Sequence, residues 1–178
     1  MVGCDSRKKS GLVKNYGPAR KRSSDMLLSD FLQPDLVSMD LASEGKMEVL
    51  TELGDLLSRS SASLDGKAVT RAFVERERLA TTGVGDGIAI PHAKIEGLKE
   101  NKIAIGISRT GIDFDAIDDK AVKIFVALGA PLNSSGEHLR LLAQISRLLK
   151  DPEIRNRLVE AQNAEDLISI IRTEEAKH

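Results

Sequence analysis

Residues 82–94 read TGVGDGIAIPHAK, a run of glycines spaced by two followed by a short apolar segment and a proline–histidine pair. Pro91 has a fixed φ and biases the residue before it toward an extended backbone, so we expect His92 at the end of a strand. Glycines reach backbone conformations that other residues avoid and can turn N–H groups toward an anion. The three in question are Gly83, Gly85 and Gly87. The stretch predicts a phosphoryl-binding loop that delivers a histidine.

Histidine suits phosphoryl chemistry because its ring, with an ordinary pKa of about 6.5, is largely neutral and nucleophilic near pH 7. Phosphoryl transfer depends mainly on positioning and charge stabilisation. A lone histidine after a strand is more often a hydrogen-bonded structural residue, and only the context of His92 favours chemistry. A nucleotide site is a weaker interpretation, because the glycine spacing is not G-x-G-x-x-G and no Gly-Lys-Ser/Thr follows.

Composition indicates one soluble domain, since 41% of the 178 residues are hydrophobic and 30% are charged. The net charge of −1 gives no basic field for nucleic acid or an anionic membrane. We find no apolar run long enough for membrane insertion. Cys4 is the single cysteine, which excludes an internal disulfide or a cysteine-built metal site and favours a reducing, cytoplasmic location.

Residues 1–25 differ from the rest, with seven Lys or Arg residues against two Asp and few apolar side chains. Such a segment has little to bury, so we expect a disordered basic tail followed by a domain over 26–178. It lacks the apolar region of a secretory signal. A solvated arm, a contact with nucleic acid or a partner, and translation from Met26 remain open alternatives.

The remaining sequence alternates between helical and extended patterns. Residues 43–60 form an expected helix with Ser43 as N-cap, and its apolar face comprises Met47, Leu50, Leu53 and Leu57. A second helix follows Asp65 and ends near Leu79, with Val69, Ala72 and Phe73 facing inward. Residues 103–107 alternate as in a strand, whereas residues 122–128 are almost uniformly apolar and predict a strand covered on both faces.

Three further helices are expected in the last quarter of the chain. The first spans residues 137–150, with Leu139, Leu142 and Leu149 on its apolar face. Asp151 and Pro152 begin the second, and Asn163 caps the third, which carries Leu167, Ile170 and Ile171. Strands interleaved with helices predict a single α/β domain, a mixed β-sheet with helices on both faces.

Two blocks of sequence carry a family resemblance. Residues 76–92, RERLATTGVGDGIAIPH, resemble the signature of the IIA domains of the bacterial phosphoenolpyruvate-dependent phosphotransferase system, in the fructose/mannitol class. Residues 122–131 together with 137–143 resemble the second histidine segment of that family. Residues 80–81 are Ala-Thr where relatives often have Gly-Ser. The resemblance extends over about residues 26–173.

The resemblance implies a role for three side chains. His92 is the residue that would be phosphorylated, His138 a second active-site histidine that orients or stabilises the phosphoryl group, and Arg76 an active-site arginine. A guanidinium suits a doubly charged phosphoryl group. Without the motif, Arg76 and His138 would be read as solvated helix residues. The family needs no cofactor or metal, because phosphate comes from phosphoenolpyruvate through phosphocarrier proteins.

The resemblance also implies partners. The donor would be the histidine phosphocarrier protein HPr or its nitrogen-branch relative, and sugar-specific members pass the group to a IIB domain. The chain has no room for fused IIB or IIC domains, so we expect a free-standing carrier. Residues 111–118, GIDFDAID, and this solitary architecture look more like the nitrogen-regulatory branch, whose members bind regulatory targets according to phosphorylation state. Regulation and sugar transport therefore remain the two hypotheses.

Overall fold

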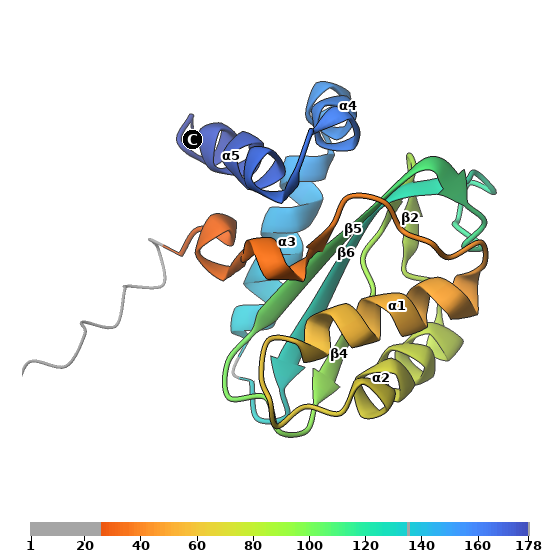
Figure 1. Ribbon diagram of the computed structural model, residues 1–178, viewed down its shortest axis with the longest axis vertical. Coiled ribbons are helices and arrows are strands. Elements are labelled where there is room, and N and C mark those ends of the chain that lie inside the picture. The colour runs from red at the N-terminus through yellow and green to blue at the C-terminus, as the bar shows by residue number, and fades with distance from the viewer. Residues whose placement is uncertain (1–25, 135, 178) are drawn as a thin grey trace, which may run out of the picture.

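A computed structural model describes residues 26–134 and 136–177 of the protein (Figure 1). The expected disorder of residues 1–25 lies outside these ranges. The described residues form a mixed sheet whose strands are β1 (Val37–Ser38), β2 (Gly83–Gly85), β3 (Ile88–Ala89), β4 (His92–Ile95), β5 (Lys102–Ile112) and β6 (Val122–Pro131). Along the sheet the order is β1-β5-β6-β3-β2, and β4 also pairs with β6.

The sheet is mixed because its two long strands run in opposite directions. β5 and β6 are antiparallel, whereas β3 and β4 both run parallel to β6. The connection between the parallel strands β1 and β5 contains two helices, whereas the chain passes from β3 and β4 to their parallel partner β6 through the antiparallel strand β5. The prediction of strands over 103–107 and 122–128 is confirmed, with both strands longer than expected.

Helices cover both faces of this sheet, as predicted. One face carries α1 (Lys46–Ser58) and α2 (Gly66–Leu79), and the other carries α3 (Glu137–Leu149), α4 (Pro152–Glu160) and α5 (Ala164–Glu175) (Figure 1). Two short 3-10 helices, η1 (Leu28–Phe31) and η2 (Pro34–Leu36), precede β1, and η1 packs with α5. No helix in the described ranges combines the length and hydrophobicity needed to cross a bilayer.

β6 divides the interior into two cores because alternate side chains point to opposite faces. Ile124, Val126 and Leu128 join the core beneath α3, α4 and α5. Phe125 and Ala127 join the core beneath α1 and α2. The prediction that this apolar run is covered on both faces is therefore confirmed.

Local capping signals located most helix starts. Asp65, Asp151 and Asn163 each accept a backbone hydrogen bond as N-cap of α2, α4 and α5, as predicted. The prediction for Ser43 was wrong, because α1 begins at Lys46. The Ser43 N–H and hydroxyl instead donate to the carboxylate of Glu52, which lies nine residues further along the chain in α1.

Leu50, Leu53 and Leu57 of α1 and Leu149 of α3 are buried as predicted, but one residue of each predicted apolar face is exposed. Met47 is 56% exposed because the buried stripe of α1 is shifted toward Val49 and Leu56, which leaves Met47 at its margin. Leu139 is 61% exposed, since α3 buries Leu141, Ile145 and Leu149 instead. Several sets of positions on one helix have three- and four-residue spacing. Packing against the sheet determines which of these sets is buried.

Candidate functional site

A cavity of about 150 Å³ opens where α2, β4, β6 and α3 meet. Its lining residues are Arg76, His92, Ala93, Lys94, Leu128, Ala130 and His138. The structure thus brings together the three side chains selected from the sequence, which lie 62 residues apart along the chain between Arg76 and His138. The floor from β6 is apolar and the rim is basic, which suits a small anion.

Pairing with β6 positions His92. Its register partner is Leu128, whose N–H donates to the carbonyl of Pro91 at 2.8 Å. His92 begins β4 and does not end a strand, contrary to the prediction. The reason is Pro91, which has no N–H to donate and so interrupts the ladder between β3 and β4.

Hydrogen bonds assign the two ring nitrogens of His92 different states. Nδ1 lies 2.8 Å from the carbonyl oxygen of Ile90, which can only accept, so Nδ1 carries the proton. Nε2 then holds a lone pair and accepts from Nε–H of Arg76 at 3.3 Å. This tautomer directs the nucleophilic nitrogen into the cavity.

The pKa of His92 is lowered from 6.5, and burial is the largest cause. The hydrogen bond to Ile90 opposes the shift, while electrostatic interactions with Arg76 and His138 add to it and the interaction with Glu77 opposes it. A buried ring beside a guanidinium favours the neutral form. The ring of His92 is therefore neutral near pH 7.

Arg76 is fixed near the end of α2. Its Nη1 donates to the carbonyl of Ala80 at 3.1 Å, while its Nε faces His92. A guanidinium has five N–H donors in a planar fork, more than these two bonds require. Arg76 therefore has further N–H donors that can bind oxygen atoms of a phosphoryl group.

His138 enters from the first turn of α3. Gly136 precedes this turn with a φ of 88°, a conformation that favours glycine. Nδ1 of His138 lies 2.9 Å from the hydroxyl of Ser134, which orients the ring. His138 faces the same cavity as His92 and can donate to a bound anion.

Lys94 is a cavity residue that the sequence reasoning missed. It lies two residues after His92 in β4, so the two side chains share one face of the strand. Strand periodicity at the histidine would have identified it. Its ammonium adds a cation to the rim of the cavity.

The predicted glycine loop does not line this cavity. Gly83 donates to Thr81 and accepts from Ile117, and the carbonyl of Gly87 accepts from Lys123 and Ile124. Gly87 thus lies near the start of β6, and the four residue-to-residue steps from Ile88 to His92 span roughly 13 Å of extended chain.

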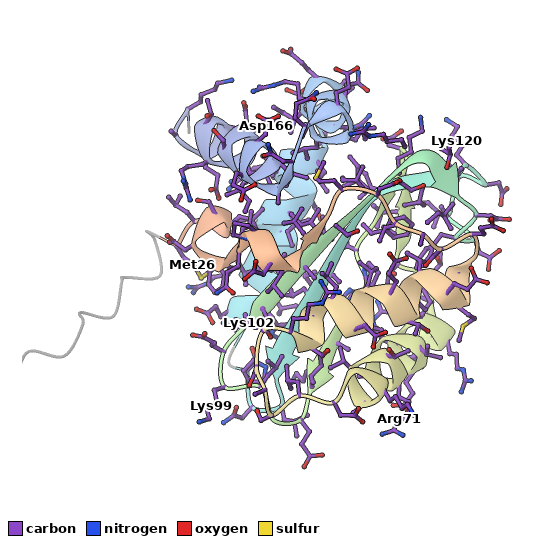
Figure 2. All side chains as sticks on the ribbon, viewed as in Figure 1. Met26, Arg71, Lys99, Lys102, Lys120 and Asp166 are labelled. Carbon is purple, nitrogen blue, oxygen red and sulfur yellow. The ribbon has the colours of Figure 1, made fainter. Side chains whose placement is uncertain are left out.

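Figure 2 places Lys99 and Lys120 at opposite ends of the sheet. The glycine turn lies toward the Lys120 end, whereas β4 runs from His92 toward the other end. Gly85 and Gly87 have positive φ angles of 92° and 75°, which a tight hairpin between β2 and β3 requires. The glycines therefore shape a turn, and their placement gives no support to phosphoryl binding.

Known proteins resemble the chain in sequence and in fold. The family described as "Phosphoenolpyruvate-dependent sugar phosphotransferase system, EIIA 2" matches residues 30–174. The nitrogen regulatory protein of Pseudomonas aeruginosa is 33% identical over 144 residues, covering 81% of this chain and 94% of that protein. The crystal structure of nitrogen regulatory protein IIA-Ntr from Neisseria meningitidis has 33% identity and a TM-score of 0.76, covering 81% of this chain and 98% of that one.

A sugar-specific relative is also similar. The fructose-specific EIIABC component of Bacillus subtilis is 32% identical over 146 residues, which are 82% of this chain. The chain spans only 23% of the length of that relative. The comparisons thus cover most of this chain and connect it with both a regulatory and a sugar-specific branch.

Proposed function

This chain belongs to the EIIA 2 family of the phosphoenolpyruvate-dependent sugar phosphotransferase system, and we propose that it carries a phosphoryl group on Nε2 of His92. The observation that carries the proposal is the ring geometry. Nδ1–H is bound to the Ile90 carbonyl, and Nε2 faces a cavity that also contains Arg76 and His138. The group that reacts and the groups that would bind its negative charge therefore occupy one small space.

The transfer step follows from this arrangement. The Nε2 lone pair attacks phosphorus on the donor's phosphohistidine, a new N–P bond forms, and the donor's N–P bond breaks. The donor imidazole, protonated on its other nitrogen, leaves as the neutral ring with that electron pair. The proton of His92 stays on Nδ1, where the Ile90 carbonyl stabilises the positive charge that develops on the ring.

Arg76 and His138 stabilise the incoming group. Fixed N–H donors in a partly buried cavity stabilise charge more than mobile water does, because they need little reorganisation. Donation from Arg76 to Nε2 must give way to donation to a phosphoryl oxygen as the N–P bond forms. The step uses side chains alone, and phosphate from phosphoenolpyruvate arrives through a protein donor, so no resident cofactor is needed.

We infer that the donor is a histidine phosphocarrier protein, HPr or a nitrogen-branch relative, and that the output is regulatory. The nitrogen regulatory relatives match over nearly their full length, which supports this branch, and a fructose-specific EIIA component of Haloferax volcanii matches over 89% of its length, which supports the alternative. Phosphorylation adds about −1.5 to −2 charge units at the cavity. A basic rim would become acidic, and partners that read this surface would bind differently.

Sugar transport is the alternative, favoured by the fructose-specific relative. In that case phospho-His92 would pass its group to a IIB domain. A chase experiment separates the two functions: loss of label to an added IIB domain supports transport, and retention of label with altered binding to a regulatory target supports regulation.

The primary test uses labelled phosphoenolpyruvate, enzyme I and each phosphocarrier. We expect an acid-labile, alkali-stable adduct that maps to Nε2 of His92, and no label on His92→Ala. His138→Ala should still accept phosphate, more slowly. Label on Ser, Thr or Asp, or full labelling of His92→Ala, contradicts the proposal, and label on His138 reverses the assigned roles.

A further inference from the structure

Glu77, the residue after Arg76 in α2, is buried, and 4% of its side chain is exposed. A buried carboxylate is costly unless hydrogen bonds and an opposite charge compensate it. Both oxygens of Glu77 accept from the Thr82 N–H at 3.0 Å, and one also accepts from the Thr82 hydroxyl. Lys46 of α1 lies 3.0 Å away and supplies the positive charge. The carboxylate thus has hydrogen-bond partners and an opposite charge, although it does not line the cavity at His92.

A chain of hydrogen bonds connects this carboxylate with His92, and a second chain, which includes the covalent backbone from Thr82 to Ala80, connects it with Arg76. Thr82, held by Glu77, accepts through its carbonyl from the Ile90 N–H at 2.9 Å. The Ile90 carbonyl in turn accepts from Nδ1–H of His92. Glu77 therefore anchors the backbone group that sets the tautomer of His92.

The second chain leads to Arg76. Thr82 ends the turn that follows α2, and Ala80 lies within that turn. The Ala80 carbonyl accepts from Nη1 of Arg76, so its position fixes the guanidinium. If the Glu77–Thr82 clamp opened, both the carbonyl behind Arg76 and the carbonyl behind His92 would lose their support.

We propose that Glu77 is a positioning residue for phosphoryl transfer, which holds Thr82 so that Arg76 and Nε2 of His92 face each other. The inference rests on the proposed function of His92. It adds a role for a side chain that touches neither the phosphoryl group nor the cavity. A misplacement of reacting groups by a fraction of an ångström lowers transfer rates, which is why a buried clamp matters here.

Glu77→Gln is the informative variant, because it keeps the shape, removes the charge and replaces one acceptor oxygen by an N–H₂ donor. Glu75→Gln is the matched control, an exposed position in the same helix. We expect Glu77→Gln to slow single-turnover transfer from the phosphocarrier about tenfold or more. Nitrogen NMR of the imidazole should show His92 as the Nδ1–H tautomer in the native chain and in Glu75→Gln, and as a mixture in Glu77→Gln.

A purely structural Glu77 would lower the melting temperature and leave both readouts unchanged. Equal rates and tautomers in folded Glu77→Gln and Glu75→Gln therefore overturn the proposal. If Glu77→Gln does not fold, variants of Thr82 provide the test. Thr82→Val should change the His92 tautomer and slow transfer, whereas Thr82→Ser should keep the native tautomer and rate. Native tautomer and rate in both variants would overturn the inference. Absence of label on His92 in the native chain would refute the proposed function, whereas the tautomer measurement tests Glu77 separately.

Discussion

The imidazole of His92 is held from both sides. The Ile90 carbonyl binds Nδ1–H, and Arg76 approaches Nε2. Because one nitrogen is committed to the backbone, the other is the reactive one. The geometry also makes the residue sensitive to pH and to the shape of the arginine fork, and each dependence can be measured.

Uptake of phosphate should persist as the pH falls through 6.5, because burial lowers the pKa of His92 and only its neutral ring has a lone pair on Nε2. Arg76, His138 and Glu77 are the titratable side chains that influence the ring electrostatically. An NMR titration of His92 should give a midpoint below 6.5. As the pH falls, the unfolded chain takes up this proton before the folded chain does. The contribution of His92 to the free energy of unfolding therefore decreases as the pH falls from about 6.5 to the native pKa. A native midpoint at or above 6.5 would contradict the expectation.

Arg76→Lys should slow transfer about tenfold or more, corresponding to ~1.4 kcal/mol, with the fold intact. Lysine keeps a positive charge but loses the planar fork, which donates to the Ala80 carbonyl through one nitrogen and leaves other N–H groups for phosphoryl oxygens. Single-turnover labelling measures the effect. Arg78→Lys, exposed on the same helix, is the control and should match the native rate. If Arg76→Lys and Arg78→Lys transfer at the same rate, Arg76 acts as a solvated surface residue and has no role in transfer.

At the scale of elements, the position of Arg76 in the cavity depends on how α2 packs against its neighbours. Asp65 caps its start, and Arg76 and Glu77 lie in its last turns. α1 packs closely along it, and this pairing covers one face of the sheet. The contact is closest at Gly54, where a Cβ atom would lie 2.3 Å from the Thr70 hydroxyl and 3.0 Å from the Thr70 nitrogen.

Gly54→Ala should therefore destabilise the protein by about 1–3 kcal/mol, because a methyl group would force the two helices apart. The Thr70 side chain can rotate away, but its backbone nitrogen cannot. Denaturant unfolding measures the change. Gly45→Ala is the comparison, since no described atom lies within 4 Å of its added Cβ, and we expect a cost below about 1 kcal/mol there. A stable Gly54→Ala variant would show that α1 can shift freely on α2.

At the scale of the whole molecule, the start of the described chain is fastened to its end. The N–H groups of Leu28 and Ser29 donate to Glu175 of α5, and Gln144 of α3 donates to the carbonyl of Met26. Met26 lies beside these helices in Figure 2. Leu28 and Leu32 belong to the core beneath α3, α4 and α5.

A chain that begins at Met26 should keep the thermal midpoint and the phosphorylation rate of the full chain, because these contacts remain and residues 1–25 have little to bury. A chain that begins at Gln33 serves as the control and should melt lower, since it lacks Leu28 and Leu32. Calorimetry and labelling test both. A loss of several degrees on removing residues 1–25, roughly the effect of 1 kcal/mol or more, would show that they pack on the domain.

Local signals were sufficient for much of the fold. Asp151 and Asn163 were recognised as caps, and Asp65 as the residue that precedes a helix, because a cap bonds N–H groups only two or three residues away. The apolar run of β6 was recognised because burial on both faces removes the need for alternation. The Pro-His pair and the second histidine segment identified the family, and the comparisons confirm that resemblance.

Only the tertiary structure decided which of the selected residues share a site. Arg76, His92 and His138 come from three elements that meet through pairing with β6, whereas the adjacent glycines extend along the sheet away from the cavity. Proximity in sequence is not proximity in space along an extended strand, where each residue adds about 3.3 Å. The Glu77–Thr82 clamp and the tautomer of His92 arise in the same way. They depend on hydrogen bonds whose partners are chosen by packing, and a linear pattern does not contain that choice.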